Sequence, residues 1–396
     1  MHDGATGPAR SPWAAAFALA LASAVSLGLA RFAYAMLLPP MRADLGWSYF
    51  LAGAMNTANA AGYLAGALLV PRAMARLDAR ALMLAGGFGA AALLALHAAT
   101  ANDAALLVLR FGTGMASAAS FVCGGVLAAR LGSASAHPGR VLGLYYGGTG
   151  FGIVASALAV PPLVVLQVAH AWRWAWVALA VLALAATAIT ALGTRGRGAP
   201  PAAAGARGRF DWRPFGFGLA GYLMFGLGYI GYMTFVITLL REQGLRDGLV
   251  IAFYVLLGCG VVASSWLWAG VLQRWHGGQA LALLNALLAV ATALPALSAH
   301  PAAVFASGLL FGSVFLSVVA STTALVRHNL PAAAWPAGIA AFTIVFAFGQ
   351  IVGPSLIGWV ADGEGGLVRG FAWSAGVLAL GAVLAMRQRA LVAAGA

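Results

Sequence analysis

The strongest constraint in this sequence is its division into long apolar blocks that carry almost no charge, separated by short segments containing Arg, Asp, Pro or Gly. Of 396 residues, 62% are hydrophobic and only 8% are charged, and the mean hydropathy is +0.92. A soluble globule needs more polar surface than this. About 20 apolar residues in a helix cross the hydrocarbon core of a bilayer, and a helix satisfies its own backbone hydrogen bonds there. The sequence therefore predicts an all-α membrane protein.

Twelve apolar segments are long enough to be transmembrane helices. The first begins after Arg10 and runs to about Pro40, which is longer than the apolar core of a signal peptide, so we expect it to be the first membrane helix. The twelve helices are expected near residues 13–40, 48–71, 81–99, 104–129, 140–168, 172–192, 214–240, 248–273, 279–298, 302–326, 333–361 and 367–386.

The distribution of Arg predicts the orientation of these helices. Fifteen of the 22 Arg residues fall in segments on the side of the two termini, five fall on the opposite side, and two lie inside helices. Because basic residues are retained in the cytoplasm, we expect a multi-pass protein of the cell inner membrane with both termini cytoplasmic. The net charge of +13 is scattered between apolar blocks and not gathered in one patch, so we expect no nucleic-acid partner.

The chain is predicted to consist of two related six-helix bundles. Residues 1–193 would form the first, residues 214–396 the second, and the Arg-, Gly- and Pro-rich residues 194–213 a cytoplasmic linker. A shift of 198 positions aligns four pairs of residues: Gly28 with Gly226, Tyr34 with Tyr232, Arg76 with Arg274, and Gly114 with Gly312. Two such halves suit a transporter that rocks around a site at their interface.

The predicted helices contain two Arg residues and no Asp or Glu well inside them. Arg31 and Arg110 each cost about 2.5 to 3.5 kcal/mol in a membrane helix, so each should face the bundle interior. Amide and tyrosine side chains fall at a similar depth, and Tyr63 shares a helix face with two of them. The predicted solute-binding residues are Arg31, Tyr34, Asn56, Asn59, Arg110, Tyr229, Tyr232 and Gln350.

Other interpretations of this polar layer remain open. Arg110 could bond helix carbonyls as a structural clamp, the amides could join helices, and the tyrosines could be packing residues. Proton-driven carriers usually use carboxylates inside the membrane, and these helices have none well inside them. The coupling mechanism can therefore be exchange, facilitated diffusion or transport of a substrate that carries its own proton as well as proton symport, with Asp44 and Asp362 as weaker titrating candidates.

No sequence pattern of an enzyme, a cofactor site or a metal site is present, so we expect none of these. Cys123 and Cys259 lie in apolar segments, where cysteine usually behaves as a small hydrophobic residue. Gly148, Gly150 and Gly152 lack the spacing of a dinucleotide fingerprint and instead predict a groove for another helix backbone.

Several motifs resemble those of the major facilitator superfamily, and in particular its YbfB/YjiJ-type branch. They are Gly28-Leu-Ala-Arg31-Phe-Ala-Tyr34, Asn59-Ala-Ala-Gly62-Tyr63-Leu-Ala-Gly66, Arg110-Phe-Gly-Thr-Gly114 and Gly349-Gln350-Ile-Val-Gly353-Pro354. The resemblance covers nearly the whole chain and implies the major facilitator fold. The loop after the second helix keeps its positive charge but has Ala75 where the superfamily usually has Asp, and the fifth helix lacks the Pro of many antiporters.

The resemblance, the glycine row and the internal repeat together suggest residues that control conformational change. These are Arg72, Arg76, Asp78, Arg80, Gly148, Gly150, Gly152, Arg274, Gly353 and Pro354.

The function predicted from the sequence is secondary active or facilitative transport by alternating access. The partners would be the lipid bilayer and a small organic solute, for which the unpaired Arg residues favour an anion, and the protein would be a monomer. One alternative is efflux of apolar or cationic compounds. Another is a receptor or assembly protein that uses a transporter scaffold without transporting.

Overall fold

The computed structural model describes residues 12–166, 168–197 and 210–391, and these residues form helices and connecting loops without strands. The α-helices in chain order are α1 Pro12–Ser23, α2 Tyr34–Leu45, α3 Tyr49–Met74, α4 Ala79–His97, α5 Asp103–Ser133, α6 Pro138–Ala159, α7 Pro161–Val164, α8 Trp172–Gly193, α9 Gly216–Glu242, α10 Asp247–Leu267, α11 Ala269–Arg274, α12 Gln279–Leu297, α13 Pro301–Asn329, α14 Trp335–Ala361 and α15 Gly366–Met386. Ala24–Phe32 form a π-helix, η1, and Arg213–Phe215 and Ala332–Ala334 form short 3-10 helices, η2 and η3.

Within the described residues, eleven helical runs are long and apolar enough to cross a membrane, so the predicted number of twelve is not confirmed. The segment expected at 48–71 does form a continuous helix, α3, of 26 residues, but α3 is not among the eleven. Its polar residues, Asn56, Thr57 and Asn59, lower its hydropathy. A helix that faces other helices can be more polar than one that faces lipid, which is the physical reason for the difference.

The first membrane span is longer than predicted. It runs from Trp13 to Leu45 through α1, η1 and α2, with Pro39 and Pro40 inside α2. Arg31 therefore lies about 21 Å from the end of this span at Leu45, at about 1.5 Å per residue, which is deeper than a helix end near Pro40 would place it.

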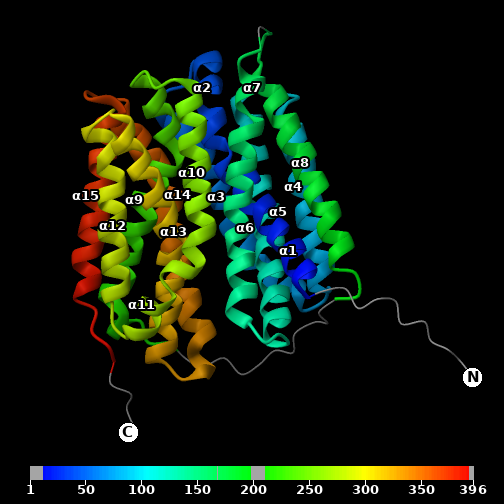
Figure 1. The fold of residues 1–396 in the computed structure, drawn as a ribbon, viewed down its shortest axis with the longest axis vertical. Coiled ribbons are helices and arrows are strands. Elements are labelled where there is room, and N and C mark those ends of the chain that lie inside the picture. The colour runs from blue at the N-terminus through cyan, green and yellow to red at the C-terminus, as the bar shows by residue number, and fades with distance from the viewer. Residues whose placement is uncertain (1–11, 167, 198–209, 392–396) are drawn as a thin grey trace, which may run out of the picture.

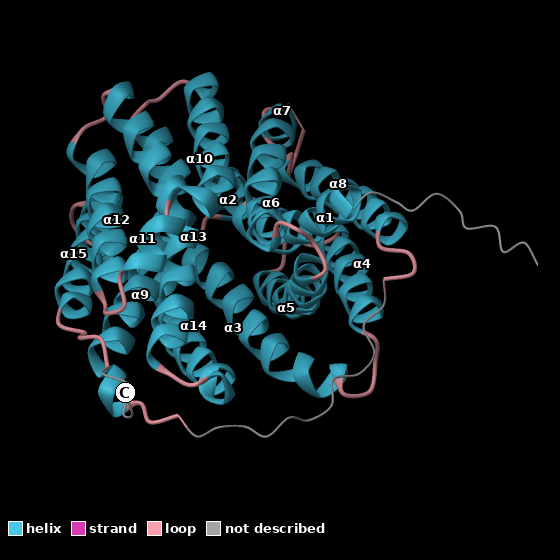
Figure 2. Cartoon of the chain, turned by 60° about the horizontal axis from the view of Figure 1, so that its bottom comes forward, coloured by secondary structure: helices cyan, strands magenta, loops and turns pink. Residues whose placement is uncertain are grey.

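The helices before and after the predicted linker gather on opposite sides of the molecule (Figures 1 and 2). Across the middle, α6 packs against α10, α3 packs against α14, and α2 packs against α9. In Figure 1, α2 and α7 lie at the upper end, and α9 begins and α15 ends at the lower end. Most of the predicted linker, residues 198–209, lies outside the described residues, so the boundaries of the two halves remain a prediction.

The internal repeat recurs as equivalent helix packing. A Cβ on Gly114 of α5 would lie 2.0 Å from the carbonyl oxygen of Asn59 in α3, and a Cβ on Gly312 of α13 would lie 2.2 Å from the carbonyl oxygen of Leu257 in α10. Both the glycines and the carbonyls that they approach are 198 positions apart. Small residues allow this approach where apolar attraction between helices is weak in lipid.

The glycine row of α6 contacts two different helices. Gly148 and Gly152 face the first span, where a Cβ would lie 2.0 Å from the Ala20 carbonyl oxygen and 2.3 Å from that of Ala24, respectively. Gly150 faces α10, and a Cβ there would lie 2.4 Å from the carbonyl oxygen of Gly258. α6 therefore packs closely within its own group of helices and also against α10.

We expect Gly150→Ala to destabilise the protein, because the methyl group would force α6 away from α10. Overpacking costs about 1 to 3 kcal/mol, and thermal unfolding of the detergent-purified protein would measure it. Gly139→Ala is the matched control, because a Cβ at Gly139 of the same helix meets no atom within 4 Å. Equal melting temperatures for the two variants would contradict the packing described for α6.

Candidate functional site

Arg31 lies in the last turn of η1, in the interior of the bundle. Only 3% of the residue is exposed. Its Nη2 donates a hydrogen bond of 2.7 Å to Oε1 of Gln350 in α14, and its buried Nε has no acceptor among the described residues. The Tyr229 hydroxyl of α9 donates to the same Gln350 oxygen at 3.1 Å. The first span thus meets α9 and α14 at one cation, one amide and one phenol.

Aromatic rings surround this cation. The centroids of the Phe32 and Tyr63 rings lie 5.7 and 5.8 Å from Arg31 Cζ, within the range of a cation–π interaction. The Tyr229 ring stacks on Phe225 and Phe346 with centroid distances of 4.6 and 5.6 Å. We call Arg31, Tyr63, Tyr229 and Gln350 the central site.

Arg110 in α5 is bonded through all three of its side-chain nitrogens. Nε donates to the Met55 carbonyl at 3.3 Å, Nη1 to the Ala30 carbonyl at 3.1 Å, and Nη2 to Asn56 Oδ1 at 2.9 Å. Its Cζ also lies 4.7 Å from the centroid of the Tyr34 ring. These contacts join α5 to η1 and α3, as the clamp interpretation of Arg110 requires.

Asn56 links Arg110 to the opposite group of helices. Its Oδ1 accepts from Arg110, while its Nδ2 donates to Thr234 Oγ1 in α9 at 2.7 Å. A movement of α9 away from α3 would break the second bond and leave the first intact.

In the π-helix η1, Arg31 directly follows the residue whose backbone carbonyl accepts a hydrogen bond from Arg110. This residue is Ala30, and the Phe32 carbonyl accepts a 2.6 Å hydrogen bond from the Tyr254 hydroxyl of α10. Short π-helical turns often occur at functional sites, because they change the side-chain register within a continuous helix.

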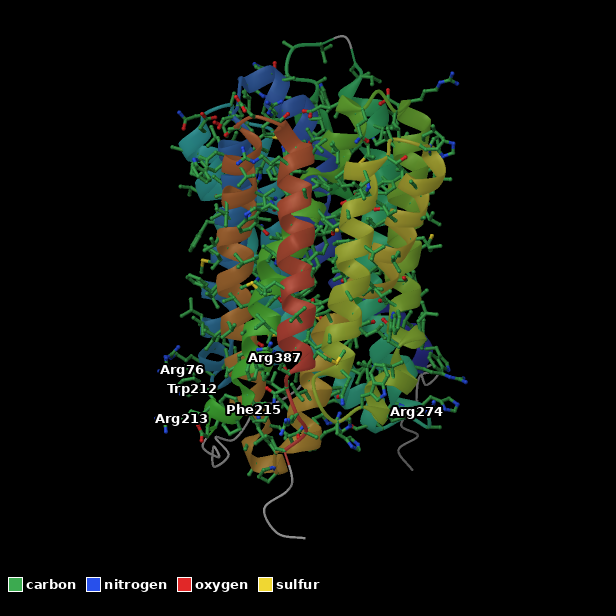
Figure 3. The ribbon with its side chains drawn as sticks, turned by 90° about the vertical axis from the view of Figure 1, so that its left-hand side faces the viewer. Arg76, Trp212, Arg213, Phe215, Arg274 and Arg387 are labelled. Carbon is green, nitrogen blue, oxygen red and sulfur yellow. The ribbon has the colours of Figure 1, made fainter. Side chains whose placement is uncertain are left out.

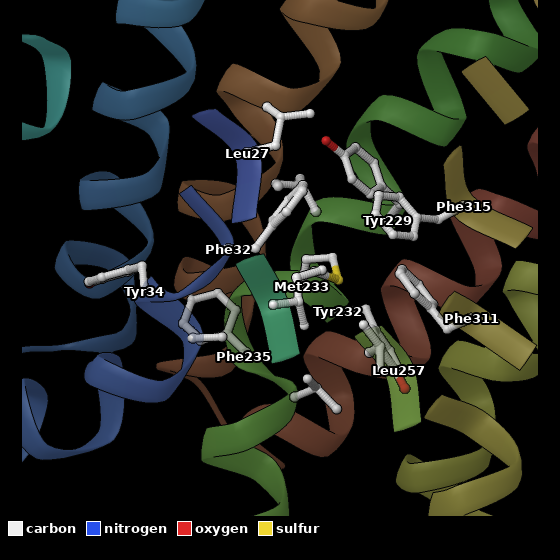
Figure 4. Close-up of a cluster of buried hydrophobic side chains, with 14 of the residues drawn as sticks. Leu27, Phe32, Tyr34, Tyr229, Tyr232, Met233, Phe235, Leu257, Phe311 and Phe315 are labelled. Carbon is white, nitrogen blue, oxygen red and sulfur yellow. The ribbon is translucent and has the colours of Figure 1, made fainter. Parts of the chain in front are cut away.

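The eight predicted binding residues separate into three sets. Arg31, Tyr229 and Gln350 meet at the central site, and Tyr34, Asn56 and Asn59 surround Arg110, with Asn59 Nδ2 donating to its carbonyl at 3.2 Å. Tyr232 lies elsewhere: its hydroxyl is 2.7 Å from Ser307 Oγ, and its ring stacks on Phe311 at 3.9 Å. In Figure 4 the hydroxyl groups of Tyr229 and Tyr232 point in opposite directions.

Sequence analysis did not include Tyr63 and Thr234 among the binding residues. Tyr63 carried a usable signal, because it lies four residues after Asn59 and therefore on the same helix face. Thr234 carried none, because a single Thr in an apolar helix usually bonds its own backbone, as Thr234 also does to the Ile230 carbonyl.

Four residues at the upper end join the two groups of helices, and we call them the upper cluster: Arg42, Tyr49, Glu242 and Asp362. The Asp362 carboxylate, after α14, accepts from the backbone N–H groups of Tyr49 and Phe50 at 2.7 and 2.9 Å. The Tyr49 hydroxyl donates to the Glu242 carboxylate of α9, and Arg42 Cζ lies 3.7 Å from the centroid of the Tyr49 ring. Among the described residues, no three His, Cys, Asp or Glu side chains group as metal ligands.

The predicted conformational residues occupy several places. Arg76 and Arg274 lie at the lower end (Figure 3). Asp78 caps the first turn of α4, and Arg80 donates to Thr194 Oγ1 at 3.1 Å and to the Ala191 carbonyl at 2.6 Å, which fastens α4 to the end of α8. Arg72 donates to the Leu68 carbonyl of its own helix. Gly353 packs against Leu227 and Ile230 of α9. The Pro354 carbonyl faces Gly53 of α3 across the middle of the molecule.

We expect Arg110→Gln to lower the melting temperature more than Arg31→Gln. Replacing Arg110 removes three hydrogen bonds to groups in η1 and α3, and each buried acceptor left without a partner costs about 1 to 3 kcal/mol, whereas Arg31 has one such bond. Thermal unfolding of both purified variants measures this order. The reverse order would show that Arg31, and not Arg110, is the structural clamp.

The family model described as "Uncharacterised MFS-type transporter YbfB" matches residues 23–386. No curated protein matches the sequence. Among solved structures, a bacterial homologue of the human lysosomal transporter Spinster, in an inward-facing and unoccupied conformation, is similar with a TM-score of 0.69 and 14% identity over 96% of each chain. The nucleoside transporter NupG gives a TM-score of 0.71 with 14% identity over 94% of this chain and 98% of its own. The human organic anion transporter MFSD10 (TETRAN) gives 0.63 with 15% identity over 95% of this chain and 100% of its own.

Proposed function

Because the chain belongs to the family of major facilitator superfamily transporters represented by YbfB, we propose that it carries a small organic anion across the cell inner membrane by alternating access. Family membership identifies it as a multi-pass membrane transporter and not an enzyme. We further propose that both termini are cytoplasmic and that residues 1–193 and 214–396 form the two halves of the transporter.

The unneutralised charge of Arg31 carries the proposal for an anion. Among the described residues, its one hydrogen-bond partner is the neutral Gln350, and it lies buried where the desolvation of a charge is costly. In the described membrane spans, Asp and Glu occur only near helix ends. A solute carboxylate would supply the missing negative charge, and an Arg guanidinium suits carboxylate geometry.

The two Arg residues together favour one negative charge on the solute. The three side-chain nitrogens of Arg110 already donate to protein acceptors, which leaves Arg31 as the cation available to a ligand. The rings of Tyr63 and Tyr229 beside Arg31 would contact an apolar or aromatic body. A monocarboxylate of this kind fits the central site better than a dicarboxylate or a sugar.

The similar structures support the fold alone. They include a nucleoside transporter and an organic anion transporter, which share 14% and 15% identity with this chain. One fold therefore carries different solutes, and the choice of an anion rests on Arg31.

The upper cluster supports an arrangement that is closed at the upper end. Its bonds connect α2 and α3 to α9 and α14 above the central site. From Tyr63, the rings of Phe121 and Tyr146 continue toward the lower end with centroid distances of 6.4 and 6.0 Å, and Tyr146 is 42% exposed. We propose that the solute reaches Arg31 from this lower, cytoplasmic side.

We expect monocarboxylates with an apolar body to raise the melting temperature of the purified protein, and dicarboxylates and organic cations not to. Arg31→Gln should abolish this stabilisation and liposome counterflow of the same compound, while Arg31→Lys should retain part of both. Arg246→Gln, at an exposed site far from the central site, is the matched control. Stabilisation by cations alone would favour the efflux alternative, and binding of a protein partner without any exchange would favour a receptor.

We expect Asp362→Asn to raise the fraction of the protein that is open at the upper end, because a neutral amide accepts more weakly than a carboxylate from the Tyr49 and Phe50 N–H groups. In a background with Cys123 and Cys259 replaced by Ser, a Cys at Thr234 should react several-fold faster with a membrane-impermeant maleimide added from the upper side. Asp103→Asn is the control, because Asp103 bonds Trp47 within the first group of helices. Equal labelling rates in both variants would exclude Asp362 from the closure.

A further inference from the structure

A pocket of about 610 Å³ lies at the lower end, between the beginning of α9 and the segment that follows α15. Arg213, Phe217, Met386, Arg387, Gln388 and Arg389 contribute to its lining. It is remote from the central site, and the transport proposal gives it no role. Arg213 and Arg387 mark its position in Figure 3.

Gln388 fixes the shape of this pocket. The residue is only 3% exposed, and its Oε1 accepts from the Gly218 backbone N–H at 3.0 Å. Its Nε2 donates to the carbonyls of Pro214 and Arg389, each at 3.0 Å, and its own carbonyl accepts from Gly278 N–H at 2.8 Å. The beginnings of α9 and α12 therefore hold the segment that carries the two Arg residues on either side of Gln388.

The lining is strongly positive. Arg213, Arg387 and Arg389 are exposed, and none of them forms an ion pair with a described residue. Asp211, two residues before Arg213, accepts from the backbone N–H of Arg213 at 3.1 Å and lies outside the lining. Three guanidinium groups around one pocket favour an anion with several oxygens, such as a phosphodiester.

The same pocket has an apolar border. Phe217 in the first turn of α9 is 46% exposed, and Met386 at the end of α15 is 60% exposed. Trp212, beside the pocket, is 61% exposed, and Trp is typical of the level where the membrane meets water. A small soluble anion has no apolar part that would contact these side chains. A phospholipid can place its headgroup on the Arg residues and its acyl chains along Phe217 and Met386.

We propose that this pocket binds one anionic phospholipid, with its phosphate between Arg213, Arg387 and Arg389. Basic pockets between membrane helices on the cytoplasmic side bind anionic headgroups in this way. The site would tether the first and last helices of the second group to the same lipid.

The test is lipid retention by the full-length protein, measured by native mass spectrometry after delipidation and titration with phosphatidylglycerol or with phosphatidylcholine. We expect phosphatidylglycerol to bind at least tenfold more tightly, and the double variant Arg387→Gln and Arg389→Gln to lose this preference. The double variant Arg387→Lys and Arg389→Lys should keep most of it, because each Lys retains the positive charge that attracts an anionic headgroup. Arg140→Gln, an exposed Arg of the same end on α6, is the matched control.

Inorganic phosphate and glycerol phosphate separate a lipid from a soluble anion. If either raises the melting temperature as much as phosphatidylglycerol does, the pocket is a soluble-anion site and the proposal is wrong. Equal retention of the two lipids, or an unchanged preference in the double variant, also overturns it. Should the double variant fail to fold, Arg387→Gln alone provides the same comparison, because this side chain is exposed and holds no other element in place.

Discussion

The rest of the structure depends on how the bundle accommodates two guanidinium groups in an interior to which the described membrane spans contribute no carboxylate. A buried cation needs acceptors, and Arg110 obtains them from two backbone carbonyls and one amide, which fixes the relative positions of η1, α3 and α5. Within the part of the chain that the structure describes, Arg31 obtains one acceptor, from Gln350, although it lies next to a carbonyl that Arg110 uses. The same residue type therefore serves two purposes at neighbouring positions, and the number of protein acceptors distinguishes them.

Sequence reasoning succeeded where a pattern has one physical solution. The motifs around Arg31, Asn59, Arg110 and Gln350 predicted the family, which the family model confirms over residues 23–386. The shift of 198 positions aligned Gly114 with Gly312, and each of these glycines lies against a backbone carbonyl of a neighbouring helix. It failed where tertiary contacts decide. The polar face of α3 is covered by other helices, which made hydropathy a poor guide to its place, and nothing in the sequence distinguishes the hydroxyl of Tyr229, which donates to Gln350, from that of Tyr232, which bonds Ser307.

The glycine contact between α6 and α10 and the upper cluster have different roles between the two groups of helices. The contact of α6 with α10 includes backbones brought close together at Gly150 and Gly258, where small residues permit dense packing. The upper cluster consists of a few directional bonds to Asp362 and Glu242, which break within a short displacement. In the proposed cycle, the first contact would serve as an axis and the second as a closure, so that a modest rotation exposes Arg31 to the opposite side.

The bridge through Asn56 implies that the carrier is chemically different on its two sides. While α9 is close to α3, the Asn56 amide group is occupied by Thr234. In the proposed cycle α9 would withdraw while Arg110 still holds the Asn56 amide oxygen, so the Asn56 N–H that bonds Thr234 would lose this acceptor. A departing or arriving solute then meets an additional donor on one side of the membrane only, and its dissociation constants at the two faces need not be equal.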